Sequence, residues 1–414
     1  MRVCDVEAER SPSILVYSSL FPHQGQPNAG VFIRERMFRV AKTLPMVVVV
    51  PVPWFPFQGL LRYLRPHFRP IAPRYERQNG VDVYFPRYLC FPGILKHLDG
   101  ILMALGSYRI VRKLLKERSI DLIDSHFAYP DGFAAVHIGK WFGLPVTITL
   151  RGTELRMSKS KPLRVRMLQA LAGATRIFSV ADSLKQLVGR YGADTTKIVV
   201  VGNGVDIDKF AAVPSVEARQ MLDLKELDKV LVSIGGIVPR KGYHRVIEVM
   251  PTLIKEFPTL KYLIVGGAGP EGDYRQDLLE QIGLLGLNEH VFLVGPKPSG
   301  ELKYILSAAD LFVLATENEG WANVFLEAMA CGLPVVTTRV GGNAEVVVDE
   351  RLGSLVDLDS SPQLADAIRH ALYREWDKDF IVEYAKKNSW DDRVETLLVN
   401  FRELTSHTSA VSDS

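Results

Sequence analysis

The sequence contains little cysteine. Cys4, Cys90 and Cys331 are its only cysteines, and they lie far apart in the chain. None of them forms a C-x-x-C pair with another, which argues against both a disulfide framework and a zinc cluster. We therefore expect the protein to work in a reducing compartment.

No signal peptide is recognisable in the sequence, and a long uninterrupted apolar run is also missing. The first ten residues, MRVCDVEAER, are acidic and contain no apolar core. Residues 43–61 carry no formal charge, but Pro45, Pro51, Pro53 and Pro56 interrupt them. This pattern fits a buried strand and loop better than a membrane span. We expect a cytoplasmic protein, soluble or peripheral at the inner face of the cell membrane.

Neither charge sign dominates the chain as a whole, since the net charge is only +3. With 414 residues, of which 47% are hydrophobic and 23% charged, the chain is long enough for two domains with full cores. Residues 62–116 differ, because they hold eleven Lys or Arg and three Asp or Glu. Aromatic residues are interleaved with these charges, among them Tyr63, Phe68, Tyr75, Tyr84, Phe85 and Tyr88. Such a segment suits an anionic membrane surface better than nucleic acid, because no nucleic-acid-binding module is recognisable. A solvated face around an irregular insertion is the alternative.

Short β-rich runs alternate with helix-length segments, which is the pattern of a parallel sheet covered on both faces. In the first half we predict strands at residues 13–20, 46–52, 81–85, 120–126, 145–150, 174–180 and 197–201, and helices at 31–42, 101–118 and 181–191. The alternation pauses at residues 203–210. It then resumes with strands at 229–236, 261–267, 290–295, 310–315, 333–338 and 353–358.

We therefore predict two doubly wound domains, residues 1–206 and 207–385. Residues 386–414 would form a C-terminal helix and tail, within a helical stretch at about 379–407. Ligands of such sheets bind beyond the carboxyl ends of the strands, so two facing domains would place the active site in the cleft between them.

The run EGWANVFLE, from Glu319 to Glu327, is the most informative part of the chain. Asn323 is the predicted N-cap of a helix. The first backbone N–H groups of that helix would then lack partners and could bind a phosphate; they belong to Val324, Phe325 and Leu326. Glu319 and Glu327 would flank this phosphate, which suits a nucleotide sugar with Glu327 on the ribose and Glu319 near the sugar. A solvated loop carboxylate and a helix-entry carboxylate favoured by the dipole are the alternative.

Two glycine-rich segments follow strands in the second half. SIGGIVPRKG contains Arg240 and Lys241, whose cations could neutralise charge on a leaving diphosphate. IVGGAGPEG contains a G-x-G-x-x-G pattern, which raises the possibility of NAD binding. That interpretation requires an acidic residue at the end of the next strand, where the chain has Gly295 instead.

Glu319 and Glu327 have the E-x7-E spacing of family 4 glycosyltransferases, the retaining GT-B enzymes, and the chain resembles this family from about residue 12 to about residue 405. The resemblance implies an α/β GT-B fold: two Rossmann-like doubly wound domains facing a cleft, with a C-terminal helix that returns to the N-terminal domain. Lys241 matches the family's donor-phosphate lysine. Gly236 stands where the family usually has Arg, and we predict that Arg240 supplies the missing charge. Gly295 and Lys297 match the loop that contacts the nucleotide base.

The same resemblance suggests roles in the first domain. His126 matches the family histidine that faces the transferred sugar, while Arg151 occupies the His position of the H-G-T-[DE] loop. Gly30 lies in a loop that the family places close to the acceptor and the donor phosphate, and its lack of a side chain would permit close approach. For Arg34 and Arg36, in the helix after this loop, we expect ordinary solvent exposure.

The resemblance implies transfer of a sugar from a nucleoside diphosphate to a hydroxyl group, with retention of configuration. The motifs of the first domain are most similar to those of bacterial polysaccharide glycosyltransferases, so a glycan or lipid-linked glycan is the expected acceptor. Two D-x-D strings, at 206–208 and 357–359, lie away from the expected cleft, and we predict no metal and no nucleic-acid partner. A nucleotide-sugar epimerase of the same fold and a non-catalytic nucleotide-binding protein are the alternatives.

Overall fold

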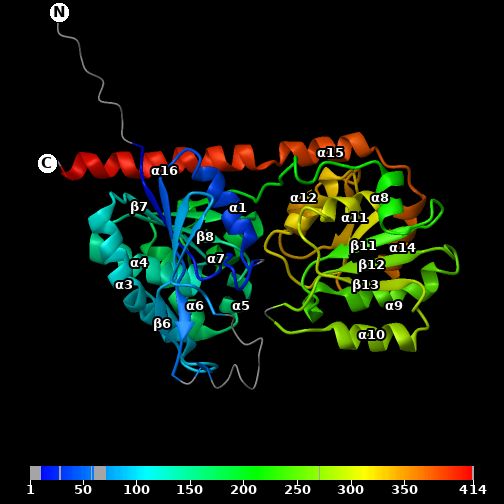
Figure 1. Ribbon diagram of the computed structural model, residues 1–414, viewed down its shortest axis with the longest axis horizontal. Helices are drawn as coiled ribbons and strands as arrows, with labels where there is room; N and C mark the ends of the chain where they lie inside the picture. The colour runs from blue at the N-terminus through cyan, green and yellow to red at the C-terminus, as the bar shows by residue number, and fades with distance from the viewer. Residues whose placement is uncertain (1–10, 28, 57, 60–70, 270, 413–414) are drawn as a thin grey trace, which may run out of the picture. The chain divides into compact units, whose positions relative to one another are not determined.

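The computed structural model describes residues 11–27, 29–56, 58–59, 71–269 and 271–412, with side chains described as far as residue 406 (Figure 1). The chain divides into two compact units. Unit 1 comprises Met1–Gly202 and Asp391–Ser414, and unit 2 comprises Asn203–Trp390.

Unit 1 contains an eight-stranded sheet with the strand order β10-β9-β8-β7-β1-β2-β5-β4. Its strands are β1 (Ile14–Tyr17), β2 (Met46–Val49), β4 (Tyr75–Gln78), β5 (Val81–Tyr84), β7 (Leu122–His126), β8 (Val146–Leu150), β9 (Arg176–Ser179) and β10 (Ile198–Val200). All neighbours are parallel except β4, which pairs antiparallel with β5. Two further strands, β3 (Val52–Trp54) and β6 (Arg87–Leu89), form a small parallel sheet.

The helices of unit 1 are α1 (Val31–Val40), α3 (Asp99–Glu117), α4 (Phe133–Phe142), α5 (Glu154–Ser158), α6 (Lys161–Gly173), α7 (Asp182–Arg190) and α16 (Trp390–Ser412). The C-terminal helix α16 runs along this unit (Figure 1). Its residues Leu397 and Phe401 are buried in the same cluster as Ile33 and Met37 of α1, and the ring of Phe401 meets that of Phe178 on β9. The predicted return of the C-terminal helix to the first domain is thus confirmed.

Unit 2 contains a six-stranded parallel sheet with the order β13-β12-β11-β14-β15-β16. Its strands are β11 (Val230–Ile234), β12 (Lys261–Val265), β13 (Val291–Gly295), β14 (Leu311–Leu314), β15 (Val335–Thr338) and β16 (Gly353–Val356). Its helices are α8 (Ser215–Met221), α9 (Tyr243–Leu253), α10 (Arg275–Leu284), α11 (Leu302–Ala308), α12 (Asn323–Ala330), α13 (Asn343–Val346), α14 (Ser361–Tyr373) and α15 (Lys378–Lys387). The predicted α/β class with two Rossmann-like parallel sheets is therefore confirmed. The helical stretch predicted at 379–407 is two helices, because α15 ends at Lys387 and α16 begins at Trp390.

The basic segment at 62–116 differs from its predicted form. Its described part is regular, since β4, β5, β6 and α3 account for most of it. Phe85 and Tyr88 are buried, at 3% and 6% exposure, so they belong to the core and do not form an aromatic surface. Tyr75 is 47% exposed and its ring packs on that of Tyr84. Tyr63 and Phe68 lie outside the described residues.

None of the helices in the described part of the chain is long and apolar enough to cross a membrane. Cys90 and Cys331 are buried free thiols, and Cys4 lies outside the described residues.

Candidate functional site

In unit 2, the predicted donor residues lie in loops that follow adjacent parallel strands. β11 pairs with β14, and β14 pairs with β15. The loops after them span residues 235–242, 315–322 and 339–342. Because parallel strands end at the same edge of a sheet, these three loops meet at the carboxyl edge, where ligands of such sheets bind.

The carboxylate of Glu319 is at the centre of these loops. Nζ of Lys241 lies 2.5 Å from Oε1 of Glu319, and Nη1 of Arg240 lies 3.5 Å from the same oxygen. Oγ1 of Thr316 lies 3.4 Å from it as well. The side chains of Lys241 and Glu319 are only 14% and 11% exposed. From the sequence we predict Lys241 on the diphosphate and Glu319 near the sugar. In the structure the two side chains form one ion pair.

Backbone contacts fix the position of Glu319. The N–H of Gly342 donates to the carbonyl of Glu319 at 3.0 Å. Gly341 has φ +49°, and a Cβ at that position would lie 1.9 Å from the same carbonyl oxygen. The carbonyl of Arg240 accepts from the N–H of Glu317 at 2.8 Å and from the hydroxyl of Thr316 at 3.0 Å. The three loops therefore hold one another, and glycine is required where they come closest.

The start of α12 differs by one residue from the prediction. Its N-cap is Ala322, which offers no side chain to cap the helix, and Asn323 is the first helical residue. Oδ1 of Asn323 instead accepts from Nδ2 of Asn203 at 2.9 Å. The N–H of Phe325, which we expected to be open, donates to the carbonyl of Ala322 at 3.1 Å. The N–H groups of Asn323 and Val324 are therefore the best placed in this turn to meet an anion.

The remaining residues of this predicted helix site have different environments. Phe325 and Leu326 are completely buried, so their side chains belong to the core. Glu327 is partly buried and lies one turn into α12. Burial, with a further contribution from Glu327, raises the pKa of the Cys331 thiol to about 12, so this thiol is not a nucleophile at neutral pH.

The predicted base-contact loop follows β13 and touches the neighbouring glycine-rich loop. The carbonyl of Gly295, which has φ +80°, accepts from the N–H of Gly266 at 3.0 Å. Lys297 is exposed. In the G-x-G-x-x-G segment, Gly269 and Gly272 pair with each other, and the next helix begins only at Arg275.

Gly30 and His126 lie in unit 1. Gly30 has φ +69° at the start of α1, and a Cβ there would lie 2.6 Å from the carbonyl oxygen of Leu20. His126 is the last residue of β7 and is completely buried. Its Nδ1 lies 3.0 Å from Nη2 and 3.2 Å from Nε of Arg151. Because guanidinium groups only donate, Nδ1 acts as the acceptor and the ring proton belongs on Nε2.

A buried network surrounds the ring of His126. Nε2 of His126 lies 3.5 Å from Oδ2 of Asp124, whose other oxygen accepts from Oγ1 of Thr147 at 2.6 Å. Burial, and then the charges of Arg151 and Arg36, lower the pKa of His126 well below its usual value. Burial raises the pKa of Asp124 to about 6, despite Thr147 and the two arginines. His126 is therefore neutral and has no exposed surface to present to a sugar.

Arg36 contradicts the expectation of solvent exposure, because it is completely buried. None of its three side-chain nitrogens makes a hydrogen bond within the described chain. Burial lowers its pKa to about 10; Asp124 opposes this effect and Arg393 adds to it. The signal was present in the sequence, since Ile33, Met37 and Val40 place position 36 on the apolar face of the helix. Arg34, by contrast, is partly exposed.

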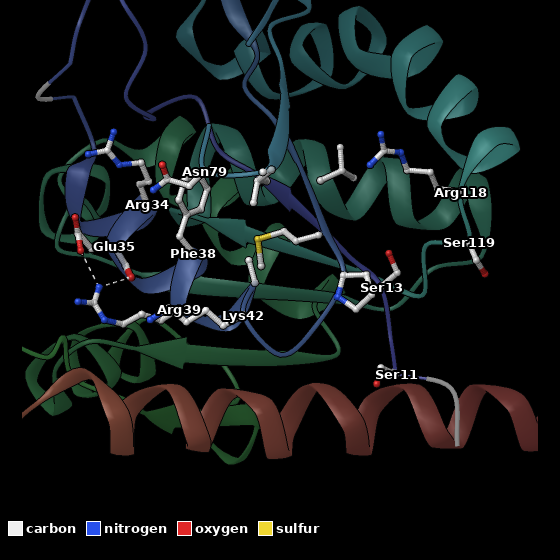
Figure 2. Close-up of a pocket in the computed structure, with 16 residues that line it drawn as sticks. Ser11, Ser13, Arg34, Glu35, Phe38, Arg39, Lys42, Asn79, Arg118 and Ser119 are labelled. Atoms are coloured by element: carbon white, nitrogen blue, oxygen red, sulfur yellow. Dashed lines mark hydrogen bonds and ion pairs between the residues drawn. The ribbon is translucent and has the colours of Figure 1, made fainter. Parts of the chain in front are cut away.

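A cavity of about 1200 Å³ lies in unit 1, near the amino ends of strands of its sheet (Figure 2). Ser13, Met46 and Val81 line it, and they lie at the amino ends of β1, β2 and β5. Arg34, Arg39, Lys42 and Arg118 also line it, with Arg39 bound to Glu35. Because ligands of parallel sheets bind at the carboxyl ends, this cavity is not a candidate for the donor.

In the described parts of the chain, no group of three or more His, Cys, Asp or Glu residues could hold a metal ion. Of the two D-x-D strings, the second has other partners: Asp359 pairs with Arg245 at 3.2 Å, and Asp357 contacts Gln363.

Two Rossmann-like units, with paired cations and a carboxylate at the carboxyl edge of a parallel sheet, define a two-domain α/β protein of the GT-B type. The solved structures that resemble it are of this kind. Sucrose-phosphate synthase from Thermosynechococcus elongatus matches with a TM-score of 0.78 and 18% identity over 96% of this chain and 100% of that one. Anabaena HepE in complex with UDP matches with a TM-score of 0.71 and 19% identity over 95% and 100%.

Sequence comparison identifies the family. The family described as "Glycosyl transferases group 1" matches residues 215–388, and "Glycosyltransferase Family 4" matches residues 67–209. The chain is 32% identical over 302 residues to a D-inositol 3-phosphate glycosyltransferase of Actinosynnema mirum, covering 68% of this chain and 72% of that protein. It is 28% identical over 402 residues to the putative teichuronic acid biosynthesis glycosyltransferase TuaC of Bacillus subtilis, covering 94% of each. The chain belongs to glycosyltransferase family 4.

Proposed function

We propose that this glycosyltransferase transfers a hexose or related sugar from a nucleoside diphosphate to a hydroxyl acceptor, with retention of anomeric configuration. The observation that carries the proposal is the cluster of Glu319, Lys241 and Arg240, in which Glu319 lies in the loop that leads into the uncapped first turn of α12. A carboxylate for the sugar and positive groups for the diphosphate are what such a donor requires.

Each donor group has a proposed place. The diphosphate binds Lys241 and the N–H groups of Asn323 and Val324, with Arg240 supplying the charge that Gly236 cannot. Glu319 binds hydroxyl groups of the sugar and Glu327 those of the ribose. The loop with Gly295 and Lys297 receives the base. No metal is required, because the cations and the helix N-terminus stabilise the leaving diphosphate.

Retention requires no protein nucleophile in this proposal. The leaving diphosphate helps to deprotonate the incoming hydroxyl on the face that it leaves. Since His126 is buried and bound to Arg151, we assign it the role of positioning residue for that guanidinium. Arg151 follows β8 and is partly exposed, whereas His126 is completely buried.

For the acceptor, we propose a glycan or a lipid-linked glycan in envelope or exopolysaccharide assembly, at the inner face of the cell membrane. The likeness to TuaC, whose name refers to teichuronic acid biosynthesis, supports this class. Co-sedimentation with liposomes tests the location: binding that rises with anionic lipid is expected, and binding indifferent to anionic lipid would contradict it.

Thermal unfolding with excess UDP, GDP, ADP, TDP or NAD tests the donor site. A ligand at about one hundred times its dissociation constant adds roughly 2.7 kcal/mol to the stability of the folded state. We expect one nucleoside diphosphate to raise the Tm of the wild type and to have less effect on Glu327→Ala. If only NAD stabilises the protein, the proposal fails.

An epimerase of the same fold is the competing activity, because its site would also bind a nucleotide sugar. Conversion of the donor to its epimer with no acceptor present would identify it. Binding of a nucleotide without turnover of any donor would instead favour a non-catalytic nucleotide-binding protein.

A further inference from the structure

Glu271 lies in the loop between β12 and α10, and its carboxylate faces Arg240. Nε of Arg240 lies 2.9 Å from both Oε1 and Oε2 of Glu271. The two loops are fastened to each other by the backbone of Ile237. Its N–H donates to the carbonyl of Gly267 at 2.7 Å, and its carbonyl accepts from Tyr274 at 3.0 Å. These backbone hydrogen bonds therefore hold the loop of Glu271 next to the loop of Arg240.

With Glu271 included, the charges in this part of the site are balanced. The two cations, Lys241 and Arg240, face two carboxylates, Glu319 and Glu271. The inner pair of Lys241 and Glu319 is 14% and 11% exposed, whereas the outer pair of Arg240 and Glu271 is 36% and 43% exposed. Water therefore screens the outer pair, which can separate at little cost.

Arg240 remains charged in this arrangement. Partial burial lowers the pKa of its guanidinium, but the carboxylates of Glu319 and Glu271 outweigh that effect and raise the pKa above its usual value. Arg240 therefore keeps its positive charge. Its partner can change, because a bound diphosphate can replace the carboxylate of Glu271.

We propose that Glu271 is a built-in counter-anion of the donor site, which weakens the hold of Arg240 on diphosphates and so favours release of the product. This inference rests on the proposed function. A free nucleoside diphosphate carries one more ionisable oxygen than its sugar conjugate, because the sugar esterifies the terminal phosphate. An unbalanced Arg240 would hold the more highly charged product more strongly than the donor. Glu271 reduces this difference.

The test is calorimetric titration of the wild type, Glu271→Gln and Asp273→Asn. Asp273 is the matched control, because it lies two residues along the same loop and pairs with Arg275 rather than with Arg240. The ligands are UDP, GDP, ADP, TDP, their glucose conjugates, and inorganic pyrophosphate. Glu271→Gln should bind the nucleoside diphosphate that the wild type binds about two- to fivefold more tightly, which corresponds to the energy of an exposed ion pair. Its effect on the glucose conjugate should be smaller, and Asp273→Asn should leave both affinities unchanged.

Unchanged or weaker binding in Glu271→Gln would overturn the inference, since Glu271 would then only orient Arg240. The gain in affinity should also shrink between 50 and 500 mM salt, because exposed charges are screened; a gain in affinity that does not depend on salt would contradict a charge effect.

If the wild type binds no nucleotide of the panel, the proposed function fails. Pyrophosphate then decides the role of Glu271: tighter binding in Glu271→Gln supports it and unchanged binding overturns it. Equal Tm values would confirm that all three proteins are folded.

Discussion

Nζ of Lys241 lies 2.5 Å from Oε1 of Glu319, although the two residues are 78 positions apart in the sequence. The contact joins the loop after β11 to the loop after β14, which are neighbouring strands of one sheet. At the donor site that we propose, a ligand would meet a carboxylate and an ammonium that are already paired, with Arg240 beside them.

Replacement of Lys241 by Met should abolish most of the activity. In the proposed mechanism this change removes a cation from the leaving diphosphate, and loss of one such interaction lowers kcat by about 100- to 1000-fold. It also leaves Glu319 without its closest partner at 11% exposure, which we expect to cost about 1–3 kcal/mol of stability. Steady-state kinetics and urea unfolding measure the two effects. Lys255→Met, at an exposed position of the same unit, should change neither.

The first N–H of α12 can be tested with proline. Asn323 is the first helical residue, a position at which proline is tolerated. The substitution Asn323→Pro therefore removes both the Asn side chain and the backbone N–H. Asn323→Ala deletes the side chain alone. We expect Asn323→Pro to bind nucleoside diphosphate about tenfold more weakly than Asn323→Ala, on the scale of a hydrogen bond to a charged group. Equal affinities of the two variants would remove this N–H from the site.

Gly341→Ala should displace Glu319. The added Cβ would lie 1.9 Å from the carbonyl oxygen of Glu319, at a residue with φ +49°. We expect the free energy of unfolding to fall by about 1–3 kcal/mol, because the loop must shift. We also expect the folded variant to lose activity, because the carboxylate of Glu319 moves with the loop. Gly300→Ala is the control, since a Cβ there meets nothing within 4 Å. Normal activity in Gly341→Ala would show that the position of Glu319 is not critical.

The buried carboxyl group of Asp131, in unit 1, should make the stability of the protein depend on pH. Burial raises the pKa of its carboxyl to about 7, although the N–H and hydroxyl of Ser19 bind it. Between pH 4 and 7 the folded form holds a proton that the unfolded chain has lost, so this group makes stability fall as the pH rises through that range. Asp131→Asn cannot ionise. We expect its stability relative to the wild type to rise from pH 4 to pH 7 by about 1–4 kcal/mol. Urea unfolding at several pH values measures this, and a constant difference would contradict the shifted pKa.

The sequence was informative wherever a motif follows a strand. Lys241, Glu319 and the first turn of α12 could be placed at one sheet edge, because parallel strands must end together. The pairing of Arg240 with Glu271 could not be predicted from the sequence, because the two residues are 31 positions apart and meet only through the packing of their loops. The N-cap was placed one residue too late because Asn is a common cap and Ala322 is not.

The burial of Arg36 was missed for another reason. Arginine is normally exposed, and this general preference predicts the opposite of the apolar periodicity of Ile33, Met37 and Val40, which the structure follows. The strand β4, with the sequence YERQ, has no alternation of apolar residues and is formed by pairing with β5. Tertiary contacts decide such elements, and local sequence does not reveal them.

The most direct test of the central claim is proton NMR of the enzyme incubated with each nucleoside-diphosphate glucose in the absence of acceptor. Water then takes the place of the hydroxyl. The account predicts slow release of one nucleoside diphosphate, with glucose first appearing in the anomeric configuration of the donor, and loss of this release in Lys241→Met. Glucose of the opposite configuration would contradict retention, and conversion of a donor to its epimer would identify an epimerase.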